Sequence, residues 1–231
     1  MINIDNNIDK IIKLFNDHKK EIYVVGGATR DLLLGLTPLD YDLTTNALPH
    51  EIETILKGYK VDKRGKHFGS YSLVIDNLSI QITTYRKEIY SKVHYPSKVV
   101  FTDKLEEDLE RRDFTINAIC YANNKLIDKF DGLGDLENKL IRLIGDKSVR
   151  FKEDPLRILR AIRFAIDFDF QIEKETLAHL KLNVPLISEL SSNLLNKEID
   201  KIDLIKHFKN PLIQLILPFV NYKLKPGDKN D

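Results

Sequence analysis

Short runs rich in β-branched and aromatic residues alternate with segments of helical spacing over the first half of the chain. The runs predict strands, at Ile22–Val25, Tyr41–Thr44, Lys57–Val61, Tyr71–Ile75 and Ser79–Thr84. Apolar residues that recur three and four positions apart predict helices, at Asn6–Asp17, Ala28–Leu34 and Pro49–Leu56. Strands and helices in this order favour a mixed sheet with helices on one face, occupying about residues 20–125.

Beyond Lys104 the helical spacing takes over. Apolar residues three and four positions apart predict further helices, at Leu105–Arg111, Thr115–Tyr121, Pro155–Asp167, Lys174–Leu182 and Leu204–Leu217. The pattern as a whole predicts an α+β protein, with an α/β head over residues 1–125 and an α-helical neck and body over residues 126–222. The polar end of the sequence, residues 223–231, is expected to fray.

Composition narrows the class of protein. The 231 residues suffice for one medium or two small domains with a real core. With 36 basic and 35 acidic residues the net charge is +1, so any contact with RNA has to come from local clusters. Cys120 is the single cysteine and cannot form an internal disulfide, and the sequence shows no signal peptide or membrane-spanning run. We expect a soluble, cytoplasmic protein.

An Asp-x-Asp pair follows a Gly-Gly turn in the first half of the chain. In an extended strand, residues two apart share a face, so Asp40 and Asp42 project into one small volume. Mg²⁺ is the expected cation there, because proteins usually hold it by one or two carboxylates plus substrate phosphates. The turn at Gly26 and Gly27 closes a strand and opens a helix, where backbone N–H groups could receive a triphosphate. Either motif alone is common in loops, but their combination favours nucleotidyl transfer.

A second charged segment runs from Glu106 to Ala118. In isolation it is typical of a solvated, charge-laced helix that ends at an Asp113 cap. The functional interpretation takes Arg111 as a phosphate ligand and Asp113 as the acceptor for a ribose hydroxyl.

A third segment places charged residues at steps of three along a predicted helix. Asp154, Arg157, Arg160 and Arg163 form this series, beside an apolar stripe. A three-residue step drifts by roughly 60°, so these side chains wind across the helix as a ribbon that could follow one nucleotide lengthwise. The carboxylate of Asp154 accepts hydrogen bonds and the planar guanidinium of Arg157 donates them, so the two together complement the edge of a base. Arg160 and Arg163 can reach phosphates. The alternative is a generic basic helix on RNA.

These segments resemble a known family. The successive motifs of the class II tRNA nucleotidyltransferases, the CCA-adding enzymes, are similar to Gly26–Asp31 with Asp40–Asp42, Asp108–Ala118, Arg142–Asp146 and Arg150–Phe164. Bacterial poly(A) polymerases share the same head. The resemblance covers about residues 15–185.

The resemblance implies a nucleotidyltransferase (polymerase β-like) head followed by an all-α neck and a truncated body. It also implies an Mg²⁺-dependent enzyme that adds C and A residues from CTP and ATP to the 3′ end of tRNA without a nucleic-acid template and releases pyrophosphate. The implied roles are metal binding and catalysis by Asp40 and Asp42, triphosphate binding by Gly27 and Arg30, phosphate and sugar binding by Arg111 and Asp113, base selection by Asp154 and Arg157, and completion of the nucleotide pocket by Arg160 and Arg163.

Three departures from the family pattern stand out. Gln81 occupies a strand position that usually carries glutamate, and an amide can ligate a metal but contributes no charge. Family members usually extend into body and tail domains that hold the tRNA elbow, whereas this sequence stops soon after Phe219, so a short form is expected. The segment Ser191–Leu195 lacks the Glu-Arg pair expected after the neck. In contrast, Arg86–Phe101 resembles, at full length, the flexible loop used in the switch from C to A.

Other functions remain open from the sequence. A poly(A) polymerase would share the same head residues, and an enzyme that adds only part of the CCA end fits the short body. From another class, Gln81 and the short body would suit a catalytically weakened RNA-binding module. The expected partners are tRNA, CTP and ATP, with no DNA and no membrane; the oligomeric state is left open, a homodimer included.

Overall fold

The computed structural model describes residues 2–91 and 93–220 of the chain, in two compact units. Unit 1 comprises Met1–Ile89 and Lys98–Leu136, and unit 2 comprises Tyr90–Ser97 and Glu137–Asp231. Unit 1 thus continues past residue 125, the expected end of the head. The expected fraying of residues 223–231 lies outside the described residues. Within the described part, no helix has both the length and the apolarity to cross a bilayer.

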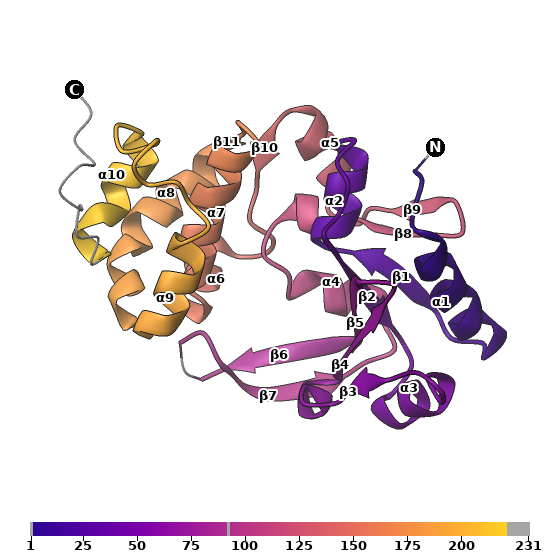
Figure 1. Cartoon of the computed structure of the whole chain (residues 1–231). Helices are drawn as coiled ribbons and strands as arrows, with labels where there is room; N and C mark the ends of the chain where they lie inside the picture. Colours follow the sequence, from indigo (N-terminus) through magenta and orange to yellow (C-terminus); the bar gives the residue numbers. More distant parts are fainter. Residues whose placement is uncertain (1, 92, 221–231) are drawn as a thin grey trace. The chain divides into compact units, whose positions relative to one another are not determined.

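Unit 1 is built on a mixed sheet, as the sequence predicts (Figure 1). Its order is β3-β4-β5-β2-β1-β8-β9, and β2 and β5 are parallel while the other paired neighbours are antiparallel. The strands are β1 (Ile22–Val25), β2 (Asp40–Thr45), β3 (Val61–Asp62), β4 (Ser70–Ile75), β5 (Leu78–Thr84), β8 (Cys120–Ala122) and β9 (Lys125–Ile127).

One face of this sheet forms the core with α1 (Asn6–Asp17) and α3 (Pro49–Ile55). The apolar residues of α1 recur at helical spacing and are buried, at Ile8, Ile11, Ile12 and Phe15. Alternate strand residues meet them from the sheet, among them Val24, Leu43, Tyr71, Ile80 and Ile82. Burying each such side chain contributes about 1.5–3 kcal/mol, so the core side of every strand is fixed and the opposite side is left for polar residues. The predicted helices Asn6–Asp17 and Pro49–Leu56 therefore share one face of the sheet, whereas α4 (Leu105–Glu110) contacts the other.

The other face carries the polar side chains of β2 and β5 and is partly covered by α4 (Leu105–Glu110). Thr44 of β2 donates to Asp108 of α4 at 2.8 Å. Between β1 and β2 the chain forms α2 (Gly27–Leu33).

Two of the predicted elements of unit 1 are wrong. The helix predicted over Thr115–Tyr121 is a single 3₁₀ turn, Thr115–Asn117, followed by strand β8. Asn123 and Asn124, both at positive φ, form a two-residue turn that pairs β8 with β9, and this hairpin overrides the helical spacing. The strand predicted over Lys57–Val61 starts only at Val61, because the preceding residues form the turn that ends α3.

The segment that resembles a flexible loop, Arg86–Phe101, forms two strands instead of an irregular loop. β6 (Arg86–Tyr90) and β7 (Pro96–Phe101) make a separate two-stranded sheet.

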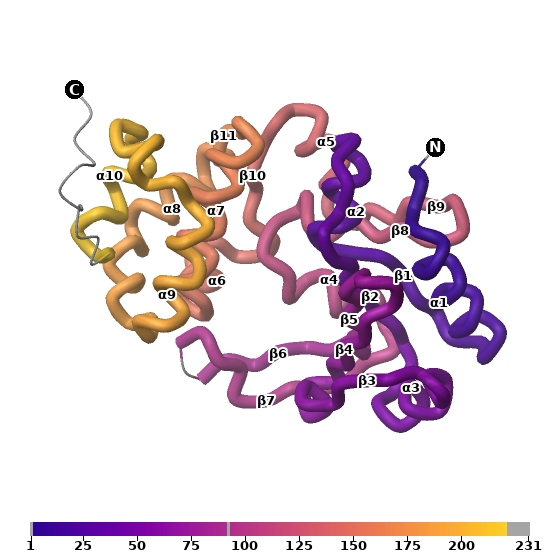
Figure 2. Tube along the Cα trace, in the orientation of Figure 1, coloured from indigo at the N-terminus to yellow at the C-terminus, as the bar shows by residue number. Residues whose placement is uncertain are grey.

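Unit 2 is helical, as predicted, with one small addition. Its helices are α6 (Lys147–Glu153), α7 (Leu156–Asp167), α8 (Lys174–Asn183), α9 (Ser192–Ile199) and α10 (Pro211–Ile216), while α5 (Gly132–Glu137) lies where the two units meet in the sequence. β10 (Leu140–Ile141) and β11 (Gln171–Ile172) pair in parallel. α9 packs beside α7 within this unit, as Figure 2 shows along the trace.

The helix predicted over Leu204–Leu217 is too long. It begins at Pro211, which lacks an N–H and keeps Asn210 extended, and the Asn210 side chain caps the N–H of Leu212 at 2.8 Å. Residues 204–209 form turns.

Candidate functional site

The two acids of the Asp-x-Asp motif lie on one face of β2. Asp40 and Asp42 are exposed, whereas Tyr41 between them is buried on the core side. β2 is held in register by β1 and β5, so that Asp42 lies opposite Val25 on one side and Gln81 on the other. The predicted shared face of the acids is therefore confirmed, while their role as metal ligands stays a prediction.

The Gly-Gly turn brings backbone close to Asp42. Gly26 has φ of 77°, a backbone conformation that residues other than glycine rarely adopt. A Cβ at Gly26 would lie 3.3 Å from Oδ2 of Asp42 and 3.7 Å from Nη1 of Arg112. Glycine at this position thus leaves room beside the acid, where the sequence predicts that a triphosphate binds.

The donor set fits Mg²⁺ bound together with a substrate. In the part of the chain that the structure describes, no group of three or more His, Cys, Asp or Glu side chains could hold a metal by itself. Two exposed carboxylates with the amide of Gln81 on the adjacent strand leave ligand positions for phosphate oxygens and water. Mg²⁺ is usually bound in this way, through one or two carboxylates plus substrate phosphates.

Gly27 and Arg30 lie at the first turn of α2. A Cβ at Gly27 would be 3.4 Å from Nη2 of Arg30, so the guanidinium lies directly against this turn. Arg30 is buried, and it donates to Oδ1 of Asp31 from Nε at 3.0 Å and to Oδ1 of Asn117 from Nη1 at 2.7 Å. The amide nitrogen of Asn117 in turn donates to Asp113 at 3.1 Å. Asn117 therefore links two residues that the sequence analysis had chosen separately, although it was not itself a candidate.

Asp113 also makes a local hydrogen bond to the backbone, although it does not end the charged helix, because α4 ends at Glu110. Its Oδ1 accepts from the N–H of Phe114 at 2.8 Å, at the start of the 3₁₀ turn. Its predicted contact with a ribose hydroxyl stays a prediction.

A buried carboxylate, Asp108, organises the arginines on the acidic face. It accepts from Nε of Arg111 at 2.9 Å and from Nη2 of Arg112 at 3.4 Å. It also accepts from Thr44, two residues after Asp42, and from the N–H of Arg86 at 3.1 Å. Burial opposes the charge, but the two guanidinium groups and these hydrogen bonds outweigh it, so the pKa of Asp108 is below its ordinary value.

Asp154 and Arg157, for which the resemblance implies base selection, lie in unit 2, at the junction of α6 and α7. Asp154 is extended at this break, and its Oδ1 accepts from the N–H of Leu156, the first residue of α7, at 3.1 Å. Arg157 is buried, and its Nη1 donates to the carbonyl of Arg150 at 2.6 Å. Glu153 joins them through Arg150 at 2.7 Å and Arg157 at 3.4 Å. Asp154 and Arg157 are thus placed at one helix junction.

Arg160 and Arg163 continue along α7 in unit 2. The Cζ atoms of both lie over the ring of Phe164, at 5.2 and 4.3 Å from its centroid. Arg163 also pairs with Asp167 at 3.1 Å and with Glu198 of α9 at 2.6 Å. The predicted role of both arginines at phosphates stays a prediction.

Glu198 is a residue that the sequence analysis missed. It is buried, and although burial opposes its charge, Arg163 and Lys201 keep its pKa below the ordinary value. It supplies a buried acid shortly after Ser191–Leu195, the segment that lacks the expected Glu-Arg pair.

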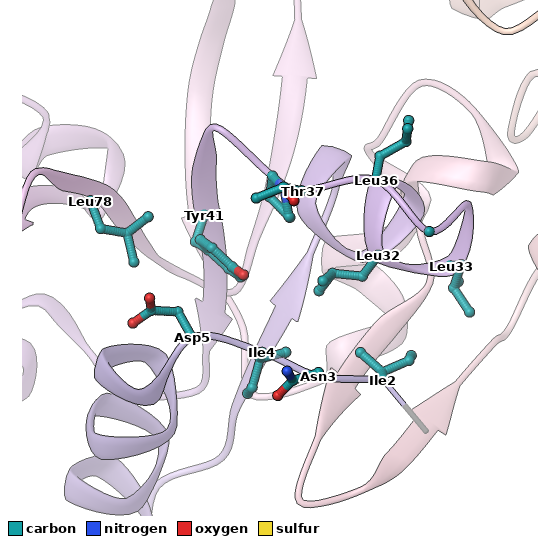
Figure 3. A pocket seen from close by; sticks show the side chains of 12 residues that line it. Ile2, Asn3, Ile4, Asp5, Leu32, Leu33, Leu36, Thr37, Tyr41 and Leu78 are labelled. Carbon is teal, nitrogen blue, oxygen red and sulfur yellow. The ribbon is translucent and has the colours of Figure 1, made fainter.

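A cavity of about 670 Å³ lies on the core side of β2, away from the acids. Figure 3 shows Tyr41 turned toward Asp5 and Leu32 in this cavity, and burial raises the pKa of that tyrosine. The residues that line it include no lysine or arginine, and Asp5 adds a negative charge. This cavity is therefore unsuited to a triphosphate, and Asp40 and Asp42 lie on the opposite face of the sheet.

Replacing Asp108 by asparagine tests the importance of this buried acid. We expect Asp108→Asn to lower the free energy of unfolding by about 3–5 kcal/mol at neutral pH, because two arginines lose their buried partner. Since the pKa of Asp108 is lowered on folding, its contribution is complete above the unfolded-state pKa of about 3.9 and is lost as the pH falls through the lower, folded-state pKa. Urea unfolding across this range measures the difference.

The matched control is Glu106→Gln, on the same helix but exposed, which should change the free energy of unfolding by less than about 0.5 kcal/mol. Equal stability of Asp108→Asn and Glu106→Gln would contradict the assignment.

Comparisons with known proteins agree with this fold. Residues 22–142 match the family described as Poly A polymerase head domain. Among curated relatives, the CCA-adding enzyme of Lactobacillus johnsonii is 42% identical over 193 residues, which cover 83% of this chain and 48% of the relative. The CCA-adding enzyme of Lactococcus lactis subsp. lactis is 40% identical over 225 residues, which cover 95% of this chain and 54% of the relative.

Solved structures give the same result. A Bacillus stearothermophilus CCA-adding enzyme in complex with CTP is 33% identical with a TM-score of 0.77, and the match covers 92% of this chain and 50% of that one. A tRNA nucleotidyltransferase complexed with a primer tRNA and an incoming ATP analog is 32% identical with a TM-score of 0.75, covering 92% and 64%. The chain spans about half the length of the curated relatives it matches. Since the head-domain match takes in more than half of its residues, the chain belongs to the poly A polymerase head domain family.

Proposed function

We propose that this protein adds C and A residues from CTP and ATP to the 3′ end of tRNA and releases pyrophosphate. The observation that carries the proposal is the pair Asp40 and Asp42, exposed on one face of β2 beside the glycine turn at Gly26. The names of its relatives, CCA-adding enzymes, support the same reaction. An enzyme of this kind would act in the cytoplasm, and its oligomeric state, a homodimer included, stays open.

The proposed chemistry assigns metal binding to Asp40 and Asp42. Mg²⁺, when bound, lowers the pKa of the RNA 3′-hydroxyl and neutralises charge on the triphosphate. The protein then has to position both reactants, and positioning together with charge stabilisation supplies most of the acceleration. Arg111 and Arg112, held by Asp108, provide positive charge on the same face of unit 1. Gly26 and Gly27 let phosphate oxygens approach the backbone.

Base selection is assigned to Asp154 and Arg157 in unit 2. Cytosine and adenine both present an exocyclic amino group, which a carboxylate can accept from, whereas uracil and guanine present a carbonyl oxygen at that place. The guanidinium of Arg157 is a planar donor fork, and its burial among Arg150 and Glu153 limits the orientations it can take. Arg160 and Arg163 are assigned to the nucleotide phosphates.

A poly(A) polymerase is the second candidate, because the family description covers such enzymes. Partial addition and a weakened RNA-binding module also remain candidates, the latter because Gln81 lies beside Asp42.

One assay distinguishes all four functions. The protein is incubated with Mg²⁺ and tRNA ending before the first C, at CC and at CCA, with each nucleoside triphosphate singly and in mixtures. We expect extension to CCA and no further. Long A-tails on unstructured RNA would indicate a poly(A) polymerase, incomplete ends a partial enzyme, and tRNA retention without incorporation a binding module.

The acid pair is tested by Asp42→Ala. We expect incorporation to fall by about 1,000-fold, equivalent to about 4 kcal/mol of transition-state stabilisation, because one metal ligand is lost. The circular dichroism spectrum and melting temperature should be unchanged, since this side chain is exposed. Asp103→Ala, an exposed aspartate of the same unit, is the control and should retain full activity. Near-normal activity of Asp42→Ala would contradict the metal assignment.

The base-selecting role is tested by Arg157→Ala. We expect the choice between CTP and ATP, measured as the ratio of kcat/KM on tRNA ending at CC, to change by about tenfold, the value of one good hydrogen bond. Triphosphate binding should change less. Arg64→Ala, which removes an exposed arginine, should leave the ratio unchanged. An unaltered ratio in folded Arg157→Ala protein would count against this role.

A further inference from the structure

We infer that His94 is a positioning residue for base selection, which holds one oxygen of Asp154 so that the other faces the incoming base. The inference deepens the proposed function and rests on it. His94 lies in the connection between β6 and β7, within the stretch Tyr90–Ser97 that belongs to unit 2. No motif in the sequence assigns this histidine a role.

Two contacts join His94 to the junction of α6 and α7. Its Nδ1 lies 2.7 Å from Oδ1 of Asp154, and both side chains are 16% exposed. Its main-chain N–H donates to the carbonyl of Glu153 at 2.8 Å. A contact made by both the main chain and the ring fixes the imidazole relative to the carboxylate more closely than either contact would alone.

The two carboxylate oxygens of Asp154 have different hydrogen-bond partners. Oδ1 accepts both from His94 and from the N–H of Leu156, while in the described part of the chain Oδ2 takes part in no hydrogen bond. With Oδ1 held from two sides, the carboxylate cannot rotate freely, and Oδ2 keeps one direction in which to accept a hydrogen bond from an amino group. Neutral imidazole with its proton on Nδ1 is sufficient for this, so no charge on His94 is required.

The last residue of β6, Tyr90, contacts the second member of the pair, Arg157. The ring of Tyr90 lies under the guanidinium of Arg157, with Cζ 5.8 Å from the ring centroid. The end of β6 and the connection that follows it therefore contact Arg157 and Asp154, the residues to which base selection is assigned.

A merely structural role for His94 would fasten this connection to α7 without affecting which nucleotide is chosen. To separate the two roles, a variant has to change the ring without straining the backbone. His94 has φ of 69°, and this angle decides which substitutions meet that condition. Glycine and asparagine tolerate this conformation, whereas alanine would add backbone strain. His94→Gly removes the ring while keeping the backbone, and His94→Asn places an amide donor near the position of Nδ1.

The experiment measures, for wild type and both variants, kcat/KM with CTP and UTP on tRNA ending before the first C, and Kd for each triphosphate by calorimetry. We expect His94→Gly to reduce the preference for CTP over UTP by about tenfold in both measurements, as one hydrogen bond would. His94→Asn should restore the preference to within about threefold, and melting temperatures should be equal. His67→Asn, an exposed histidine of unit 1, is the control and should have no effect.

The outcomes separate the two claims. An unchanged preference in His94→Gly, or a loss that His94→Asn fails to restore, overturns the positioning role and leaves the proposed function standing. Selective binding of CTP by wild type without any incorporation overturns the proposed function, while loss of that binding preference in His94→Gly still supports the positioning role. Absence of any preference in wild type overturns both.

Discussion

The head of this protein depends on keeping two like charges side by side. Two carboxylates two residues apart in a strand are separated by about 6–7 Å, and at an effective dielectric constant of about 20 they repel by about 2.5 kcal/mol. The sheet makes this arrangement unavoidable, because the core on the other face fixes which residues of β2 point outward. Arginines anchored by the buried Asp108 reduce the repulsion, and a divalent ion bound with a triphosphate would remove it.

A second set of charges in unit 2 serves a different purpose. Around the junction of α6 and α7, buried or half-buried ions pair with one another and with backbone groups, from Arg150 through Glu153 to Arg157. Buried ion pairs add little net stability, but removing one partner is costly, so such a network fixes orientations more than it stabilises the fold. Fixed orientation is the property that discrimination between bases requires.

The sequence predicted the features that follow from local periodicity. The shared face of Asp40 and Asp42 and the helix Asn6–Asp17 are both decided by spacing within a few residues. Predictions failed where a distant partner decides the structure. The strand at Cys120–Ala122 depends on pairing with β1 and β9, and it replaces the helix that its spacing indicated.

Asp108 and Glu198 were not identified from the sequence for the same reason. Asp108 in a run of acidic residues and Glu198 in a run of charges look like solvated surface, and only their contacts with arginines mark them as buried. The pairing of His94 with Asp154 joins residues far apart in the sequence and leaves no local signal.

Metal binding by the acid pair is the claim on which the account rests, and titration of Mn²⁺ into the protein in the presence of CTP tests it most directly. Wild type should bind the ion, and the double variant Asp40→Asn, Asp42→Asn should lose that binding while keeping its melting temperature. Equal Mn²⁺ affinity in wild type and the double variant would contradict the account.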